Sequence, residues 1–467
     1  MDLLNKKGKI FLTGIGGIGM SGIAEILHNL GYEVFGSDIK DGSNVRRLKK
    51  MGIKTKIGHH EENIIDASLL VYSSAIKQNN KELKKARSLR IPIISRSEML
   101  AELMRMKKTI TVAGSHGKTS TISIISEIFY TSKLDPTVIN GGIINSFGSN
   151  TRLGSSEWMI VETDESDGSF VNLPSFCGLI TSIDDEHIDY YENIENLEKA
   201  FEEYINNTSI FGFSAICSDD NTAFNLAKKQ NRLDIVFYGT NRKANYRAKN
   251  IRIKNNGQFF DIEINYLNKK NNIYKNIFFP MHGKHNLNNA LGAIALSHKL
   301  GINFQSIKKA LKNFQGVKRR LTLVSEYKGI CFYDDYAHHP SEIRATLKAL
   351  KELRMNRIIT VIQPHRYSRV KHTFQNYIRS FADSNLTVVL PVYAAGEKPI
   401  KKYSSKFIVK AINEQSKNLA CKFDDFLSVE SFLLKEIKKG DLVVFMGAGS
   451  ISGWANNFVS KLSKSNE

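Results

Sequence analysis

The chain has 467 residues, of which 42% are apolar and 24% are charged, and its formal net charge is +20. This length exceeds what one ordinary hydrophobic core fills, so two or three domains are expected, and the apolar content excludes a largely disordered chain. The positive charge is spread over lysines typical of solvated helix faces, without a basic stripe interleaved with aromatic residues. That pattern argues against a nucleic-acid partner and fits an anionic small-molecule substrate.

The sequence predicts no membrane insertion. The longest apolar runs, such as Leu442 to Met446, have the length of a strand and fall short of the roughly 20 residues of a membrane-spanning helix. The N-terminus shows no signal-peptide core, so we expect a cytosolic protein. The cysteines are scattered without a C-x-x-C pair, which indicates core thiols rather than disulfides or a metal site. They are Cys177, Cys217, Cys331 and Cys421.

Strands and helices alternate along the chain, a pattern typical of parallel sheets with crossover helices. The first series is expected to contain strands at 9–13, 33–37 and 69–73 and a helix at 20–30. The pattern restarts near Lys108 with a strand at 109–113 and a helix at 121–130. It restarts after Arg320 with strands at 330–333, 358–362, 388–390 and 442–445. The sequence therefore predicts an α/β protein of three domains, at 1–106, 107–318 and 319–467.

A glycine-rich loop, Gly14-Ile-Gly-Gly-Ile-Gly19, follows the first expected strand and opens the first helix. Asp38 stands at the end of the next strand. This is the dinucleotide-binding pattern, in which glycines let the backbone approach a pyrophosphate and the acidic residue faces a ribose. The loop alone is compatible with NAD binding in an oxidoreductase, with the pyrophosphate of another nucleotide, or with glycines that serve only helix–strand packing.

A second glycine loop, Gly114-Ser-His-Gly-Lys-Thr-Ser120, lies between an expected strand and an expected helix. In such a loop the backbone N–H groups bind phosphates, Lys118 supplies a cation for the β- and γ-phosphates, and Thr119 or Ser120 supplies a hydroxyl for Mg²⁺. The usual motif has four residues between its glycines, whereas this loop has two, and Val112 stands where the first glycine would be. The Gly-Lys-Thr sequence still predicts that the chain binds ATP.

Further polar motifs follow in order along the chain. They are Glu162-Thr-Asp-Glu-Ser-Asp167, Asp184 to Asp189 around His187, His285-Asn286 with Asn289, Arg319-Arg320, Asp334-Asp-Tyr-Ala-His-His-Pro340, Gln363-Pro-His-Arg-Tyr-Ser-Arg369 and Gly447-Ala-Gly449. With the two glycine loops and Ser73-Ser-Ala-Ile76, this ordered set resembles the Mur ligases of peptidoglycan synthesis over essentially the whole chain. Each motif alone has a structural alternative; Asn286 and Asn289, for example, could cap a helix at 290–300.

The resemblance implies a Rossmann-like first domain for the UDP part of the substrate and a central phosphate-loop domain for ATP. It implies a Rossmann-like third domain that closes over the amino acid. The implied activity is that of an ATP-dependent acid–amino-acid ligase, which joins L-alanine to the lactyl carboxylate of UDP-N-acetylmuramate through an acyl phosphate. Mg²⁺ is the implied cofactor, and neither nucleic acid nor a membrane takes part.

The resemblance also assigns residues to these roles. Contacts to the UDP part are implied for Gly16, Gly17, Ile18, Gly19, Asp38, Ser73 and Ser74. Contacts to ATP are implied for Gly114, Ser115, His116, Gly117, Lys118, Thr119, Ser120, Asn289 (adenine), Arg320 (γ-phosphate) and Asp335 (ribose). Mg²⁺ ligands are implied at Thr119, Glu162 and His187. Catalytic roles, including contacts near the alanyl moiety, are implied for Lys118, His187, His338, His339, Arg366 and Arg369.

The residue chemistry agrees with these roles. Phosphorylation makes a carboxylate electrophilic, and cations must offset the repulsion among ATP, the carboxylate and the UDP diphosphate. Arginine suits the carboxylate end because its planar fork binds two oxygens. Mg²⁺ prefers oxygen ligands, so Glu162 is a natural ligand and His187 a less natural one. A histidine can accept the amine proton, and His187, His338 and His339 are all candidates.

Two comparisons within the family favour L-alanine as the amino acid. Ligases that add later residues carry a carbamylated lysine, and the corresponding place here falls at Phe201, which cannot form a carbamate. A ligase that attaches a whole tripeptide has a first glycine loop that reads differently from Gly-Ile-Gly-Gly-Ile-Gly-Met-Ser. Three alternatives stay open: an NAD-dependent oxidoreductase, a nucleotide-binding protein associated with nucleic acid, and a sibling ligase with another amino acid or peptide.

Overall fold

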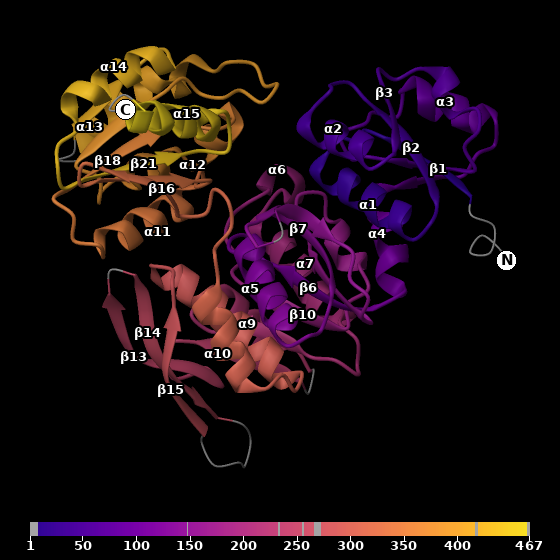
Figure 1. Ribbon diagram of the computed structural model, residues 1–467, viewed down its shortest axis with the longest axis horizontal. Helices are drawn as coiled ribbons and strands as arrows, with labels where there is room; N and C mark the ends of the chain where they lie inside the picture. Colours follow the sequence, from indigo (N-terminus) through magenta and orange to yellow (C-terminus); the bar gives the residue numbers. More distant parts are fainter. Residues whose placement is uncertain are drawn as a thin grey trace. The chain divides into compact units, whose positions relative to one another are not determined.

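The computed structural model describes residues 8–146, 148–231, 234–254, 256–265, 272–415 and 419–464. The strands form three sheets, and helices connect most of the parallel neighbours (Figure 1). This confirms the α/β fold with three sheets that the alternating pattern predicts. Within the described ranges, no helix combines the length and the apolar character needed to cross a membrane.

The first sheet has five parallel strands in the order β3-β2-β1-β4-β5. They are β1 (Lys9–Thr13), β2 (Glu33–Asp38), β3 (Lys54–Ile57), β4 (Leu69–Tyr72) and β5 (Ile93–Ser95). The helices around them are α1 (Ile18–Asn29), α2 (Ser43–Lys50), α3 (Lys81–Ser88) and α4 (Arg96–Arg105). The strand order reverses between β1 and β4, so the loops after these two strands diverge at a topological switch point, where open α/β sheets bind ligands.

The second sheet has ten strands in the order β15-β14-β13-β12-β11-β10-β6-β9-β7-β8. They are β6 (Lys108–Ala113), β7 (Thr137–Ile144), β8 (Ser149–Arg152), β9 (Trp158–Glu162), β10 (Cys177–Ile180), β11 (Ser214–Cys217), β12 (Ile235–Gly239), β13 (Tyr246–Lys254), β14 (Gly257–Ile264) and β15 (Asn272–Phe279). The accompanying helices are α5 (Lys118–Thr131), α6 (Ile188–Tyr191), α7 (Ile194–Asn207), α8 (Asn221–Lys229), α9 (Lys284–Lys299) and α10 (Phe304–Asn313). Because β6 pairs in parallel with both β9 and β10, the loop after β6 emerges between the carboxyl ends of two neighbours.

The third sheet has six strands in the order β16-β17-β21-β18-β19-β20, of which only the β16–β17 pair is antiparallel. They are β16 (Thr322–Tyr327), β17 (Ile330–Asp335), β18 (Arg357–Ile362), β19 (Leu386–Val389), β20 (Leu419–Lys422) and β21 (Asp441–Met446). The helices are α11 (Pro340–Lys351), α12 (Tyr367–Arg379), α13 (Ser405–Gln415), α14 (Phe426–Glu436) and α15 (Ile451–Lys464). Short 3₁₀ turns elsewhere lie at Glu61–Ile64, Ser169–Asn172 and Lys401–Tyr403.

Alternate residues of the central strand β21 enter two separate cores of the third sheet. Leu442 and Val444 pack in the core that contains apolar residues of α11, α12 and α13. Val443 and Phe445 pack in the core that contains residues of α14 and α15. The sheet is therefore covered on both faces, which explains why β21 is one uninterrupted apolar run after its first residue.

The chain divides into two compact units. The first runs up to Lys249 and also contains Phe260–Ile277 and Asn288–Gln315, and the second contains Asn250–Phe259, Phe278–Leu287 and the chain from Gly316 onward. The first unit holds both the first sheet and β6 to β12, and one hydrophobic core joins them, since Met99 and Met104 of α4 share it with Met159 of β9. The limits of the three expected domains, at 106 and 318, stay predictions.

The expected strands agree with the structure to within about two residues, the usual uncertainty of element ends. The helix expected at 121–130 begins earlier, at Lys118, because Gly117 caps it directly after the loop. The helix expected at 290–300 begins at Lys284. Asn286 and Asn289 therefore lie inside α9, and the alternative that they cap this helix is wrong. All four cysteines are free thiols; Cys177 and Cys217 are buried in the core, as expected, whereas Cys331 and Cys421 are half-buried.

Candidate active site

The first glycine loop lies at the switch point of the first sheet. Gly14 has a φ of +80°, and Gly17 occupies the N-cap of α1. Asp38, at the end of β2, accepts the Gly16 N–H through Oδ2 at 2.9 Å and the Lys40 N–H through Oδ1 at 3.1 Å. A Cβ on Gly16 would lie 2.9 Å from the same Oδ2, so only glycine allows this close approach. The Asp38 carboxylate thus fixes the shape of the loop.

The segment after β4 lies against this loop. A Cβ on Gly14 would lie 3.1 Å from the Ser73 Cβ, and the Ser73 N–H donates to the Thr13 carbonyl at 3.1 Å. Ser74 follows Ser73 and is exposed. The residues with implied contacts to the UDP part, which come from three separate loops, therefore flank one switch point. Their contacts to a ligand stay predictions.

The phosphate loop runs from the end of β6 to α5. Gly114 has a φ of +129° and Gly117 a φ of +82°, which L side chains rarely adopt. Because Gly117 is the N-cap of α5, the N–H groups of Lys118, Thr119 and Ser120 belong to the first turn and have no partner within the helix. These N–H groups and the positive end of the helix dipole favour an anion. The shortened loop therefore keeps the geometry that phosphate binding requires.

Lys118, whose side chain is 15% exposed, is paired with a carboxylate to which the sequence motifs assign no role. Its Nζ lies 2.6 Å from Glu165 Oε2 and donates to the Gly114 carbonyl at 2.5 Å. Burial by itself would lower the pKa of Lys118, but the carboxylates of Glu165 and Glu162 outweigh burial and raise this pKa, so the ammonium form persists. Burial raises the pKa of Glu165, and the charge of Lys118 opposes that rise.

Thr119, in the first turn of α5, faces Glu162, the last residue of β9. Thr119 Oγ1 lies 3.0 Å from each carboxylate oxygen of Glu162. The Gly141 N–H donates to Glu162 Oε2 at 2.6 Å, which fixes the carboxylate. A hydroxyl and a carboxylate this close supply the oxygen donors that Mg²⁺ prefers. These two residues therefore fit the ion that the sequence motifs imply.

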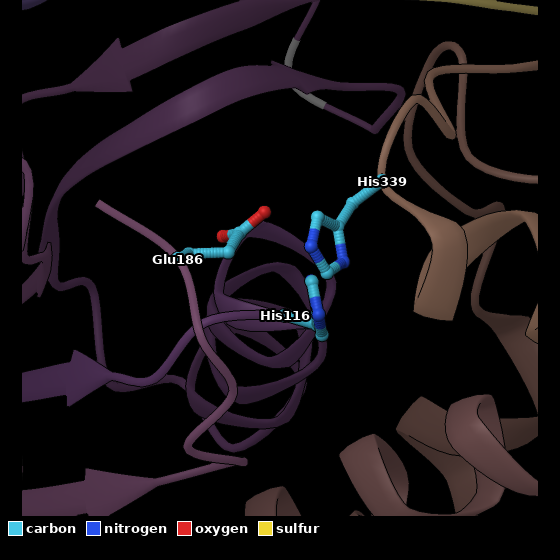
Figure 2. Close-up of side chains that lie close together, drawn as sticks. All are labelled: His116, Glu186 and His339. Atoms are coloured by element: carbon cyan, nitrogen blue, oxygen red, sulfur yellow. The ribbon is translucent and has the colours of Figure 1, made fainter. Parts of the chain in front are cut away.

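The segment after β10 lies along the other side of the loop. His116 Nε2 lies 3.1 Å from Asp184 Oδ2, and the Asp184 N–H donates to Ser115 Oγ at 2.8 Å. Figure 2 shows His116 on the loop before α5 and Glu186 on the segment after β10, with ligand atoms of the two side chains within 4.8 Å of each other. His187, with a φ of +60°, follows on the same segment and caps α6. Its role as a Mg²⁺ ligand stays a prediction.

Asn289 reaches the phosphate loop from α9. A Cβ built on Gly117 would lie 2.4 Å from Asn289 Oδ1, and Asn289 is 6% exposed. The neighbouring Asn288 side chain lies 3.5 Å from the carboxylate of Asp219. The structure therefore brings Asn289 to the same loop as Lys118 and Thr119, although the two parts are far apart in the sequence.

In the second unit, Arg320 and Asp335 occupy neighbouring segments. Both oxygens of Asp335 accept backbone N–H groups, from Leu321 at 2.6 Å and from Ala337 at 2.7 Å. Burial raises the pKa of Asp335 to about 6, and the charge of Arg320 opposes the rise. The Arg320 guanidinium carbon lies 5.0 Å from the centroid of the Tyr336 ring. The implied contacts of Arg320 and Asp335 to ATP stay predictions.

A second group of side chains in this unit surrounds His365. The rings of His338 and His365 are 5.9 Å apart between centroids, and His365 Nδ1 lies 3.1 Å from the Arg369 guanidinium. Burial lowers the pKa of His365 to about 4, and the positive charges of His338 and Arg369 act in the same direction. His338 and Arg369, which the sequence predicts to lie near the alanyl moiety, are thus connected by a histidine that the prediction omits.

Arg366 and His339 have different surroundings. Arg366 adopts a φ of +64° and pairs through Nε with Glu397 at 3.2 Å. His339, also drawn in Figure 2, is the residue before α11 and is 3% exposed. The Glu342 carboxylate accepts the N–H groups of His338 and His339 at 3.1 and 3.3 Å, which holds these two residues at the start of the helix.

Sequence reasoning missed three functional candidates: Glu165, Asp184 and His365. All three lie within motifs that carry the resemblance, but next to residues with better recognised chemistry. The partners of Glu165 and Asp184 are on other loops, so sequence spacing contains no signal for these pairings. His365 lies four residues before its partner Arg369 in the same motif, a spacing that sequence reasoning could have used. For Glu165 and Asp184, the strand order, which places the ends of β9 and β10 on either side of β6, brings the partners together.

A phosphate loop after a central parallel strand, with a hydroxyl and a carboxylate that fit a metal ion, defines the phosphate-loop class of nucleotide-binding α/β proteins. Within that class, the chain belongs to the Mur ligase family. Residues 9–108 match the family model described as "Mur ligase family, catalytic domain", residues 112–297 match "Mur ligase middle domain", and residues 319–449 match "Mur ligase, glutamate ligase domain". Membership of this ligase family overturns the oxidoreductase alternative.

Individual members of the family are also similar to this chain. The UDP-N-acetylmuramate–L-alanine ligase of Paramagnetospirillum magneticum is 45% identical over 450 residues, which cover 96% of this chain and 94% of the relative. The crystal structure of UDP-N-acetylmuramate-alanine ligase from Thermotoga maritima has a TM-score of 0.82 at 28% identity and covers 98% of this chain and 100% of its own. A murein peptide ligase from Psychrobacter arcticus shares the fold, with a TM-score of 0.70 at 20% identity and coverage of 98% and 99%.

Proposed function

We propose that the chain is an ATP-dependent ligase that forms an amide bond between L-alanine and the lactyl carboxylate of UDP-N-acetylmuramate, in the synthesis of peptidoglycan precursors. The observation that carries the proposal is the 45% identity, over nearly the whole of both chains, to the UDP-N-acetylmuramate–L-alanine ligase of Paramagnetospirillum magneticum. The site geometry supports it, because the phosphate loop, Thr119 and Glu162 supply what phosphoryl transfer needs.

The proposed reaction has two steps. A carboxylate oxygen of the UDP-sugar attacks the γ-phosphorus of ATP, the bond to the β-phosphate oxygen breaks, and ADP leaves. The amine of L-alanine then attacks the resulting acyl phosphate, the carbon–oxygen bond to phosphate breaks, and the amine proton passes to a base. Each step moves negative charge onto phosphate oxygens, which fixed cations and N–H donors stabilise.

The residues divide this work by position. The N–H groups at the start of α5 and the Lys118 ammonium would bind the transferred phosphate, with Arg320 supplying a further positive charge. Thr119 and Glu162, with His187 as a third candidate, would hold Mg²⁺, which neutralises phosphate charge when bound. The switch point around Gly16 and Asp38 would bind the UDP part.

His338 is the best supported acceptor of the amine proton. Its Nδ1 lies 3.0 Å from the Tyr336 carbonyl and 3.3 Å from Glu342, so this nitrogen carries the hydrogen in the neutral ring. The lone pair is then on Nε2, where a base needs it. Arg366 and Arg369 would bind the carboxylate of the amino acid, a task suited to their planar forks.

Phosphate release tests the proposal. Protein, ATP, Mg²⁺ and UDP-N-acetylmuramate are mixed with L-alanine, L-serine, glycine, D-alanine or the tripeptide that a sibling ligase would use. L-Alanine should give the fastest release, although a pocket that recognises one methyl group discriminates against glycine by only about 10- to 200-fold. Faster release with the tripeptide, or equal release with D-alanine, would reject the assignment.

A further inference from the structure

The Glu165 carboxylate is buried directly beneath the phosphate loop. It is 3% exposed, and its two oxygens contact different parts of the loop: Oε1 accepts the Gly114 N–H at 2.7 Å, and Oε2 lies 2.6 Å from Lys118 Nζ. A carboxylate this deeply buried is costly unless both oxygens are satisfied by donors or a countercharge. The contacts of Glu165 meet this condition only when the loop and the lysine have the geometry seen here.

The segment that carries Glu165 is itself fixed. The Tyr191 hydroxyl donates to the Glu165 backbone carbonyl at 2.7 Å, and the Thr163 hydroxyl lies 3.4 Å from Oε1. Glu165 follows β9, whereas Gly114 follows β6, so the carboxylate joins the ends of two paired strands. The backbone of Glu165 is therefore held by contacts outside the phosphate loop.

Lys118 has a long side chain that would otherwise sample many rotamers. An ammonium has three N–H donors. One is directed to Glu165 Oε2 and another to the Gly114 carbonyl, at 2.6 and 2.5 Å. The third donor, together with the first-turn N–H groups of α5, would then serve an incoming phosphate.

We propose that Glu165 is a positioning residue of the ligase reaction, which holds the Lys118 ammonium in the geometry that receives the phosphates of ATP. Glu165 acts through Lys118 and does not touch the substrate. The inference rests on the proposed function, because it assumes that this loop binds ATP. The competing interpretation is that Glu165 is a substitute anion, which occupies the phosphate site until ATP displaces it.

Three substitutions separate these interpretations. Glu165→Gln keeps the size of the side chain, but one of its two ends becomes an NH₂ group, so it cannot accept from both Gly114 and Lys118. Glu165→Asp keeps the charge and both acceptors on a shorter side chain. Glu157→Gln is the matched control, because it removes one negative charge from an exposed residue at the other end of β9.

The ligase assay should show a split between kcat and the KM values. Glu165→Gln should lower kcat by about 100-fold, the cost of misplacing a catalytic group by about 1 Å, and leave the KM values of the UDP-sugar and L-alanine unchanged. Glu165→Asp should recover part of this loss, and Glu157→Gln should equal the wild type. A kcat of Glu165→Gln within threefold of the wild type would overturn the proposal, and so would equal losses in the Asp and Gln variants.

Nucleotide binding provides a second test, which does not need ligase turnover. The Kd of Mg²⁺-ATP is measured for the wild type, Glu165→Gln, Lys118→Met and the double variant. Glu165→Gln should weaken binding by at least about threefold in the wild type and have no further effect in Lys118→Met, because coupled residues are not additive. Tighter binding by Glu165→Gln would establish the substitute-anion interpretation, and equal effects in both backgrounds would reject action through Lys118.

Folding and function are controlled separately. The double variant removes both buried charges, so it should be at least as stable as Lys118→Met, in which Glu165 lacks its countercharge. If Glu165→Gln fails to fold, Lys118→Met is compared with the double variant instead. Unequal Kd values of Mg²⁺-ATP for these two proteins would reject the proposal. A wild type that binds ATP but forms no amide would reject the proposed function alone, since the Kd cycle would still report on Glu165.

Discussion

Replacing Gly117 by alanine tests the geometry of the phosphate loop directly. Gly117 has φ +82° and ψ −5°, so a side chain at this position occupies the left-handed region. That conformation costs an L-residue about 1–2 kcal/mol. The new Cβ would also lie 2.4 Å from Asn289 Oδ1, well inside van der Waals contact. Turning the Asn289 side chain away from its rotamer adds about 0.5–1.5 kcal/mol. We therefore expect Gly117→Ala to lower the free energy of unfolding by about 2–3 kcal/mol.

The two tryptophans allow each unit to be followed separately. Trp158 packs between Phe129 and Phe176 in the first unit, and Trp454 packs against Phe426 and Phe458 in the second. In a Trp454→Phe background, urea unfolding followed by fluorescence reports on the first unit alone. The measurement compares Gly117→Ala with the same protein carrying glycine.

Gly301→Ala is the matched control, because Gly301 has a φ of +91° but no neighbouring atom within 4 Å of a built Cβ. Gly301→Ala should lower the free energy of unfolding only by the cost of the left-handed conformation, about 1–2 kcal/mol. Gly117→Ala should also couple to Asn289→Ala by about 1 kcal/mol, since the second substitution removes the clash. If Gly117→Ala costs no more than Gly301→Ala, the close approach of Asn289 to the loop is refuted.

The remaining predictions concern the second unit and use a Trp158→Phe background. Arg357 forms two hydrogen bonds with Asp441, at 2.8 and 2.9 Å, and Asp441 is 3% exposed. Arg357→Ala should lower the free energy of unfolding by about 3 kcal/mol, because it leaves this buried carboxylate without its countercharge, and Arg357→Lys should lower it less. A decrease below about 1 kcal/mol for Arg357→Ala, measured by urea unfolding, would contradict this prediction. For His365, the folded pKa of about 4 lies below the ordinary 6.5, so the unfolded chain binds the proton first and stability falls as the pH drops from 6.5 towards 4. His365→Asn should remove about 1 kcal/mol of that loss between pH 7 and pH 5, after allowance for solvent screening, and identical pH profiles for both proteins would show that His365 is not the group responsible.

The sequence predicts those parts of the fold that depend on local pattern. The apolar runs of β6, β18 and β21 are buried on both faces, so their composition alone marks them as strands. The strands β13 and β15 escape this reasoning, whereas Phe260, Ile262 and Ile264 of β14 do alternate as one buried face. Ile251 and Ile253 of β13 and Ile273 of β15 are exposed, so hydrophobic alternation does not mark a buried face.

The candidate site divides in the same way. Lys118, Thr119 and Glu162 are predictable because the loop motif places the first two in sequence and the family resemblance supplies the third. The pairing of Glu165 with Lys118, and the approach of His365 to His338, depend on where loops end in space. Neither a composition nor a spacing rule contains that information, since each partner could equally have faced water.

The core shared by the first and second sheets has a consequence for how such chains evolve. Modules joined by a solvated linker can be exchanged between relatives without change, but here Met99 and Met104 pack with Ile139, Met159 and Leu173 in one interior. A chimaera that joins the first sheet of one relative to the second sheet of another would bring together side chains selected for different neighbours, and even small volume changes in such an interior are destabilising. Recombination at this junction should therefore succeed mainly between relatives whose packing residues match, and we expect the two sheets to be inherited as a pair.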